Sequence, residues 1–412
     1  MNNDNMNKNG IKKTRRIFII FIFIFITTVI LLVGTYAWFV GITTVAINPF
    51  TITVSSGGGI EISLDGEHWR KGNDALVVTQ QAVTTTTASP DHAYEGHTNH
   101  WPSAGMDPVS SSGEIDASAS RLKLYQKISI STTEGGYKLI AGRVDNYTQN
   151  KPEADVYLTF DLFIKNGQAD PYSTEYTPNA DEAIYMLQNP YVTASTSGVN
   201  NYGLQNSVRV GFFQIGRTKT VGSTPSTIKA LSCASTPVLC APANEVADRL
   251  THTWNVWEPN DTDHAQNLIT YFNSACKKRN SDGTYQNNTA CFTLTSPYNT
   301  LPTYTVKGDI ASSDNIDIYD GINDKTPDST KLTTYTTYKT SDANSFSNDK
   351  KQLLGLAGNS ITKVRIYVWL EGQDIDNYDL ITSDTSVTIS FGLTKDKFNM
   401  GSTTSSSPSS GT

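Results

Sequence analysis

The sequence predicts a mainly β protein, a jelly-roll-type antiparallel β-sandwich with long loop insertions, preceded by an N-terminal hydrophobic helix. Three observations lead to this prediction. Short runs rich in β-branched and aromatic residues recur along the chain, several of them alternate apolar and polar residues, and helical periodicity is scarce. A chain of 412 residues with 37% hydrophobic content can also bury a core of ordinary size.

The predicted strands are bounded by Gly, Asn or Ser, which favour turns. They are 50–54, 60–64, 123–130, 137–144, 156–164, 207–215, 303–306, 364–370 and 386–393. Gly57, Gly58 and Gly59 predict a turn between the first two, because no Lys-Ser/Thr pair follows them as in a phosphate-binding loop. The period of two suits antiparallel sheets with one face in water.

Helical spacing is reasonable in three stretches, which we expect to decorate the sheets: 181–188, 263–277 and 348–356. Polar stretches with little strand pattern are interpreted as surface loops: 84–120, 171–179, 216–242, 277–298 and 309–348. The tail 401–412 is rich in Ser, Thr, Gly and Pro and cannot bury enough apolar area to offset its ordering entropy. We expect that tail to be flexible and exposed.

The N-terminal region predicts export. Residues 1–16 are basic, residues 17–33 are almost entirely apolar, and no charged side chain occurs between Arg16 and Glu61. A membrane-spanning helix needs about 20 mostly apolar residues and a signal peptide about 7 to 15, so the length fits both. The basic residues should stay in the cytoplasm. The chain then divides into a cytoplasmic n-region 1–16, a signal peptide or signal-anchor helix 17–37, an ectodomain 38–400 and the tail 401–412.

The exported part is acidic. From Ala37 onward the chain has 27 basic and 38 acidic residues, a net charge of −11. Such a body repels phosphate backbones and anionic lipid headgroups, which argues against nucleic-acid binding. Neutral glycans and soluble cations are easier partners.

The four cysteines fit an oxidising compartment. Cys233 and Cys240 bracket one short polar loop, and Cys276 and Cys291 bracket another. Three pairings are possible, and the two local disulfides are favoured. The spacings match no zinc ribbon or CxxC redox motif.

No catalytic residue, cofactor or metal site is predicted. The chain has no H-E-x-x-H, G-x-S-x-G, Walker or dinucleotide-binding pattern, so it is not expected to be an enzyme. His92, His97 and His100 are near enough in sequence to converge on zinc or copper, but they lack a helical or ribbon frame, and a solvated loop is favoured.

Two further kinds of binding site are considered, and a simpler interpretation is favoured for each. The acidic stretches 314–324 and 374–379 offer oxygen ligands for calcium but lack the EF-hand spacing, so solvated connectors are favoured. The aromatic cluster 254–260 is able to stack on a sugar ring, but core packing of its tryptophans is favoured.

Three separated pieces of the sequence resemble the exported TasA/camelysin-like proteins of Gram-positive bacteria. They are 34–39 (GTYAWF), 207–213 followed by 257–260 and His264, and 364–372 with Asp374 and Asp376. The first resembles the G-T-x-A junction that a dedicated signal peptidase reads, which implies cleavage between Ala37 and Trp38. The resemblance implies a jelly-roll protein of the cell surface or biofilm matrix, from a group whose characterised members assemble into fibres. Some members are labelled metallopeptidases, but this chain lacks the corresponding ligands and base.

The function expected first is therefore structural. Cleavage would free the apolar, uncharged segment 38–47, which can insert into a neighbouring subunit as an added strand and bury Phe39, Ile42, Val45 and Ile47. Repetition of that contact builds a filament. The expected partners are other copies or related matrix proteins, the membrane and the signal peptidase.

Two alternatives remain open. In the first, residues 17 to about 40 persist as a membrane anchor for a surface adhesin or ligand-binding module. In the second, more remote, the chain is an extracellular metal-dependent hydrolase that uses His92, His97 and His100.

Overall fold

The computed structural model describes one compact body within the unit Thr44–Thr412. The described residues are 47–72, 74–85, 90–103, 105–116, 120–126, 138–144, 156–167, 181–195, 204–235, 240, 253–260, 304–306, 315–320, 332–334, 336–345, 350–372, 374 and 385–395. The predicted n-region, the signal or anchor helix, the helix at 263–277 and the C-terminal tail all lie outside them. No described helix is long and apolar enough to cross a bilayer.

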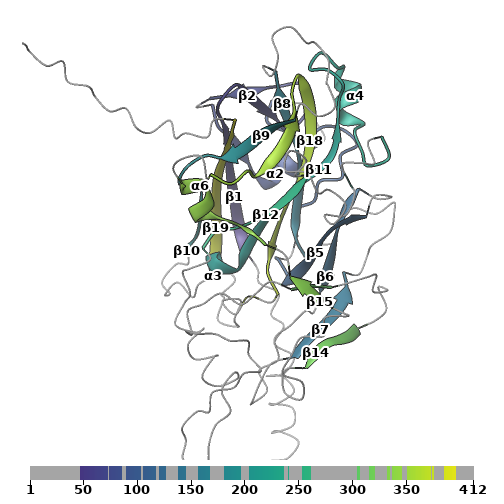
Figure 1. Ribbon diagram of the computed structural model, residues 1–412, viewed down its shortest axis with the longest axis vertical. Helices are drawn as coiled ribbons and strands as arrows, with labels where there is room; N and C mark the ends of the chain where they lie inside the picture. The colour runs from purple at the N-terminus through teal and green to yellow at the C-terminus, as the bar shows by residue number, and fades with distance from the viewer. Residues whose placement is uncertain are drawn as a thin grey trace, which may run out of the picture. The chain divides into compact units, whose positions relative to one another are not determined.

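The first large sheet has six strands and contains the N-terminal strand of the described body (Figure 1). Its order is β17 (Leu354–Ala357), β9 (Asp181–Met186), β19 (Thr385–Thr394), β1 (Ile47–Ser56) and β4 (Leu76–Val78), and β10 (Tyr191–Ser195) also pairs with β19. β1 and β19 run parallel, whereas the other pairs in this sheet are antiparallel.

The second large sheet has seven strands. Its order is β16 (Tyr338–Lys339), β12 (Trp254–Glu258), β11 (Val208–Arg217), β18 (Ser360–Leu370), β8 (Leu158–Asn166), β2 (Ile60–Ser63) and β3 (Arg70–Lys71). β12 and β16 are parallel and the other neighbours are antiparallel. The long central strands β11, β18 and β8 form the framework on which the candidate site is built.

Smaller elements complete the described body. A four-stranded sheet has the order β14 (Asn315–Asp320), β7 (Lys138–Arg143), β6 (Arg121–Gln126) and β5 (Val109–Asp116), and a two-stranded sheet pairs β13 (Tyr304–Val306) with β15 (Leu332–Thr334). The described helices are one or two turns long: α2 (Gln80–Thr84), α3 (Leu204–Ser207), α4 (Pro225–Lys229) and α6 (Thr340–Asn344). Thr79 and Thr224 start α2 and α4 by accepting backbone N–H groups of the first turn.

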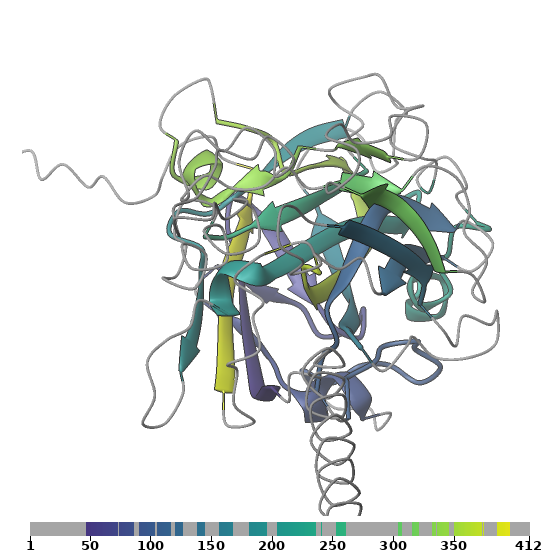
Figure 2. The same cartoon turned by 90° about the horizontal axis from the view of Figure 1, so that it is seen from below.

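The main core lies between the two large sheets. Because side chains alternate across a strand, every second residue of β18 points into this core, including Val364, Ile366 and Val368. From the other sheet, Ile389 of β19 and Ile52 of β1 enter the same apolar cluster. Both views of the ribbon show the two sheets as separate layers (Figures 1 and 2). The described body is therefore a sandwich.

The seven-stranded sheet is packed on its second face as well. Tyr367 and Trp369 project from β18 away from the main core and pack with Val109 of β5 and Leu124 of β6. Gly211 on β11 is needed here, since an added Cβ would lie 2.6 Å from Cε2 of Phe213 and 3.0 Å from Cζ3 of Trp369. The prediction that alternating strands have one wet face is thus wrong for β8, β11 and β18, which are buried almost throughout.

The structure confirms a mainly β protein and corrects several details. Each predicted strand has a counterpart, with its ends moved by a few residues. The Gly57–Gly59 turn is also present, because Ile60 N donates to Gly57 O and Gly58 and Gly59 have positive φ. The sheets are mixed, and not purely antiparallel as predicted, because of the two parallel pairs.

Two predicted helices are wrong. Residues 181–186 form β9, where pairing with β17 and β19 outweighs a weak helical spacing, and the described part of 348–356 enters β17. Three predicted loops contain regular structure: 84–120 includes β5, 216–242 includes α4, and 309–348 includes β14, β15, β16 and α6. The local sequence pattern predicted the wrong secondary structure where the partner strand is distant in sequence.

Candidate functional site

The most distinctive chemistry lies on the side of the seven-stranded sheet that faces away from the main core. We call this side the covered face and define it by Arg209, Phe213, Asp161, Phe163, Lys363, Arg365, Tyr367 and Trp369. All eight side chains are buried, and four of them are ionisable as Asp, Lys or Arg. Burial of charge is costly unless each group is paired and hydrogen-bonded, so the partners of these residues decide what the face does.

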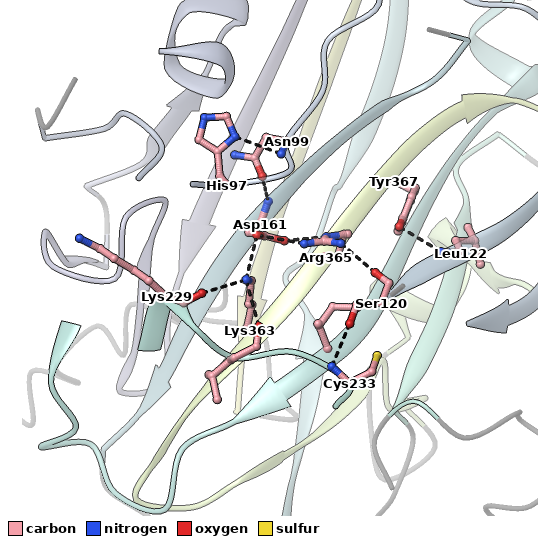
Figure 3. Close-up of polar contacts among 12 residues, drawn as sticks. His97, Asn99, Ser120, Leu122, Asp161, Lys229, Cys233, Lys363, Arg365 and Tyr367 are labelled. Carbon is pink, nitrogen blue, oxygen red and sulfur yellow. Dashed lines mark hydrogen bonds and ion pairs between the residues drawn. The ribbon is translucent and has the colours of Figure 1, made fainter. Parts of the chain in front are cut away.

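Asp161 on β8 is the centre of the first ionic cluster (Figure 3). Its Oδ1 accepts from Arg365 Nε at 2.7 Å, and its Oδ2 lies 3.2 Å from Lys363 Nζ and accepts from Tyr94 OH at 2.7 Å. Burial raises the pKa of Asp161, but the positive charges of Arg365 and Lys363 outweigh it and hold that pKa well below its ordinary value. The carboxylate is therefore held ionised although it is fully buried.

Lys363 links the sheet to the segments that cover it. Its Nζ donates to Tyr94 OH at 2.7 Å and to the backbone carbonyls of Lys229 and Leu231 at 3.2 and 3.1 Å (Figure 3). Burial lowers the pKa of Lys363, while the negative charge of Asp161 opposes that shift. Burial also raises the pKa of Tyr94, and Asp161 adds to the effect, so the phenol remains a proton donor.

Other hydrogen bonds tie further segments to the same cluster. Arg365 Nη1 donates to Ser120 O at 2.8 Å, and the backbone N–H of Asp161 donates to Asn99 Oδ1 at 2.8 Å. His100 pairs through its backbone with Thr159 on β8. The Asp161 cluster thus joins two sheet strands to three covering segments, around 94–100, 120 and 229–231.

A disulfide lies beside this cluster. Cys233 and Cys240 are bonded and both are buried, as the favoured local pairing predicts. Cys233 N donates to Ser120 Oγ at 2.9 Å, so the disulfide and Arg365 hold the same residue from opposite directions (Figure 3). The second predicted pair, Cys276 and Cys291, lies outside the described residues.

A second ionic cluster surrounds Arg209 on β11. Its Nη2 donates to Glu258 Oε1 at 2.9 Å and to Asp374 Oδ2 at 2.8 Å. Glu258 also accepts from Thr337 Oγ1 at 2.6 Å and from Lys339 Nζ. Burial raises the pKa of Glu258, but Arg209 and Lys339 outweigh it and lower that pKa to about 2.

The described residues of the two acidic stretches are Asp374 and 315–320, and the rest of both stretches lies outside the part of the chain that the structure describes. Asp374 is buried against Arg209, so its carboxylate already has a cationic partner. Residues 315–320 form β14 and pair with β7, which is a strand and not a ligand loop. The interpretation of 314–324 as a plain connector is also wrong over these six residues.

The aromatic cluster at 254–260 belongs to the interior, as the favoured interpretation predicts. Trp257 is fully buried, and its Nε1 donates to Thr340 Oγ1 at 3.1 Å. Trp254 stacks on Phe213 with ring centroids 5.6 Å apart and an interplanar angle of 2°. Trp257 therefore packs in the core, as the favoured interpretation predicts, whereas Trp254 is half-buried against Phe213.

The three histidines are not brought together as metal ligands. Within the described part of the chain, no group of three or more His, Cys, Asp or Glu side chains is placed to hold an ion. His97 accepts the backbone N–H of Asn99 at 3.1 Å and lies edge-on to Tyr94, while His100 pairs through its backbone with Thr159. Burial lowers the pKa of His97, and the charge of Asp161 opposes that effect.

The predicted cleavage and donor-strand residues lie mostly outside the described residues. These are Ala37, Trp38, Phe39, Ile42 and Val45. Ile47 is the first residue of β1 and pairs with Thr385 of its own chain. If the segment is donated, the donated part must therefore end before Ile47.

Comparison with known proteins yields no relative: no family model, no curated protein and no solved structure matches this chain. The candidate site must therefore be interpreted from its own geometry. Sequence reasoning missed the ionic clusters, although a signal was present. Asp161, Lys363 and Arg365 interrupt the most apolar strands of the chain with charge (FDLFIK and TKVRIYVWL), and such residues are rarely buried unless paired.

Proposed function

We propose that the chain is an exported structural protein of the cell surface or extracellular matrix. The observation that carries the proposal is the Cys233–Cys240 disulfide, because it lies in the folded body that follows a charge-free apolar segment. Disulfides persist in oxidising compartments, and the apolar segment supplies the means of reaching one. The jelly-roll connectivity implied by the family resemblance belongs to this proposal, with the parallel β1–β19 pair as a departure from a purely antiparallel roll.

The ionic clusters support a structural role for this body. Asp161, Lys363 and Arg365 fasten loops to a sheet through contacts that are sheltered from salt and water. The operational stability of secreted proteins is often kinetic, and a body whose covering segments are cross-linked by ion pairs and a disulfide resists local opening.

Assembly is proposed to use the segment 38–46. This segment runs directly into β1, which lies inside its own sheet between β19 and β4. The freed segment is uncharged and β-prone, and adding it to a sheet edge of a neighbouring subunit would satisfy its backbone groups. Repeated head-to-tail contacts of this kind build a filament.

The assembly step is tested with matched variants of the mature protein. Val45→Lys places a charge on a side chain proposed to be buried in the neighbour, whereas Thr44→Lys makes a similar change on the adjacent, opposite side of the strand. Electron microscopy and sedimentation should show fibres for the parent and Thr44→Lys, and monomers for Val45→Lys and for deletion of 38–46. Fibres from the deletion variant would overturn strand donation.

Export is tested separately, so that the two parts of the proposal fail independently. Mass spectrometry of the protein recovered from cells should give an N-terminus at Trp38 and an oxidised Cys233–Cys240 pair. An intact N-terminus on an oxidised protein would favour the alternative, a membrane-anchored surface adhesin or binding module. Recovery of the reduced protein from the cytosol would overturn export.

A further inference from the structure

The six-stranded sheet carries an uncharged, hydroxyl-rich surface on the side facing away from the main core. We call it the hydroxyl face and define it by Thr51, Thr53, Ser55, Val77, Tyr191, Thr193, Ser386, Thr388 and Ser390. Their neighbours Ile52, Val78, Val192 and Ile389 belong to the main core, so alternation places the nine on the outward side. Val77, Tyr191 and Thr193 are exposed and the other six are half-buried.

The two exposed large apolar side chains of the described residues end a single row on this face. Val77 pairs with Thr53, Thr53 with Ser390, and Ser390 with Tyr191. Val77 is 49% and Tyr191 47% exposed, and no other large apolar side chain among the described residues is in the exposed class. Exposed apolar groups placed in register across four strands mark an interaction surface more strongly than scattered ones do.

A second row lies parallel to the first. Thr51 pairs with Thr388, and Thr388 pairs with Thr193. Neighbouring strands are ~4.8 Å apart and residues on one face repeat every ~6.7 Å along a strand, so the two rows form a regular grid of hydroxyl groups. The grid ends at Gly392, where the absence of a side chain lets Leu187 and Ser55 approach closely: an added Cβ would lie 2.5 Å from Leu187 Cδ1.

The charge pattern selects the kind of partner. None of the nine residues that define the hydroxyl face is charged, although the chain from Ala37 onward has a net charge of −11. An anionic polymer would be repelled by the body without finding a cation on this face. A second copy is disfavoured as well, because two acidic bodies would meet across a surface that has few apolar groups to bury.

We propose that the hydroxyl face binds a neutral polysaccharide laid across the strands β4, β1, β19 and β10. Threonine and serine hydroxyls both donate and accept, as sugar hydroxyls do, and the exposed Tyr191 ring and Val77 supply apolar contact for the faces of sugar rings. This binding surface is additional to the proposed assembly through 38–46 and needs no fibre formation, but a polysaccharide partner of this kind presupposes export.

The test measures depletion of the mature protein, cleared of fibres by centrifugation, from solution by insoluble cellulose, chitin and β-1,3-glucan. Thr388→Lys puts a long charged side chain in the centre of the grid, and Thr227→Lys makes the same change on α4, at an exposed position outside the face. Tyr191→Ala removes the ring and Tyr191→Phe keeps it. We expect at least one glucan or chitin to bind, with an affinity lowered about tenfold or more by Thr388→Lys and Tyr191→Ala and unchanged in the other two variants.

Three outcomes would overturn the proposal. The first is no binding of the parent to any of the three polymers while its circular dichroism shows a folded β protein. The second is binding that Thr388→Lys leaves unchanged. The third is a change of oligomeric state in Thr388→Lys by sedimentation in the absence of glycan, which would assign the face to a second copy. Because the measurement uses unassembled protein, loss of fibres in a 38–46 deletion does not affect its interpretation.

Discussion

Asp161 on β8 and Thr388 on β19 each lie within one of the two large sheets, on the side facing away from the shared core. Asp161 is charged and has no exposed surface, whereas Thr388 is neutral and half-buried. The same contrast holds along the two surfaces: the covered face buries ion pairs beneath loops, and the hydroxyl face presents uncharged groups. On these two faces the charged side chains are buried and the more exposed side chains are uncharged, which reverses the usual arrangement.

This reversal has a physical cause. Loops that cross a sheet bring backbone carbonyls with them, and buried carbonyls need donors. Lys363 and Arg365 supply donors to the carbonyls of Lys229, Leu231 and Ser120, and Asp161 balances their charge. Thr53 and Thr388 on the six-stranded sheet are half-buried and keep some contact with water, so hydroxyl groups suffice there. The comparison predicts that substitutions on the covered face affect stability far more than substitutions on the hydroxyl face.

The largest effect is expected from Asp161→Ala. Removal of the carboxylate leaves Arg365 and Lys363 as buried, uncompensated charges, and the free energy of unfolding should fall by ~3–5 kcal/mol in urea denaturation of the full chain. The matched control is Glu61→Ala, which breaks the partly exposed pair between Glu61 of β2 and Lys165 of β8 in the same sheet and should cost under ~1 kcal/mol.

Replacing the whole Asp161 cluster sharpens this prediction. Asp161→Leu combined with Lys363→Met and Arg365→Met removes all three charges together but also removes the donors to the carbonyls of Lys229, Leu231 and Ser120, so it should destabilise at least as much as Asp161→Ala alone. A loss below ~1 kcal/mol for Asp161→Ala would mean that water reaches the cluster, and the contrast between the two faces would then fail.

The strands of the two sheets show where sequence reasoning succeeded and where it failed. The alternation in 364–370 and 386–393 correctly predicted β18 and β19, because a period of two needs only local information. The same alternation does not reveal what covers the second face, since the segments carrying Tyr94, Ser120 and Leu231 are distant in sequence from β18. Loops were therefore predicted where covering segments occur, and the buried partners of Asp161 were missed.

Acid is expected to lower the free energy of unfolding by a moderate amount. The folded-state pKa of Glu258 is about 2, below its ordinary value of 4.5, so the unfolded chain binds more protons between these values. The stabilisation from Glu258 is complete above pH 4.5 and is lost as the pH falls through about 2, an effect of ~3 kcal/mol. Asp161, whose pKa is also lowered, adds to the loss in the same direction.

The pH prediction is measured by urea unfolding at a series of pH values from 7 downward. Glu258→Gln should be less stable than the parent at neutral pH and should show a flatter decline below pH 4.5, while Glu95→Gln on an exposed loop position should follow the parent curve. Parallel curves for the parent and Glu258→Gln would show that the Arg209 cluster does not set the acid stability.

The smallest effect comes from making one isosteric change on each face. Thr159 lies on the outward side of β8, where its Oγ1 is buried with no hydrogen-bond partner among the described residues, so Thr159→Val removes an unsatisfied hydroxyl and should raise stability by ~1 kcal/mol. Thr388→Val on the half-buried hydroxyl face should change stability by under ~0.5 kcal/mol, because water satisfies its hydroxyl in the folded and unfolded chain alike. Both changes in the free energy of unfolding are measured with urea. Thr159 and Thr388 differ in whether their hydroxyl groups are buried, so equal effects would show that the covered face and the hydroxyl face do not differ in burial as described.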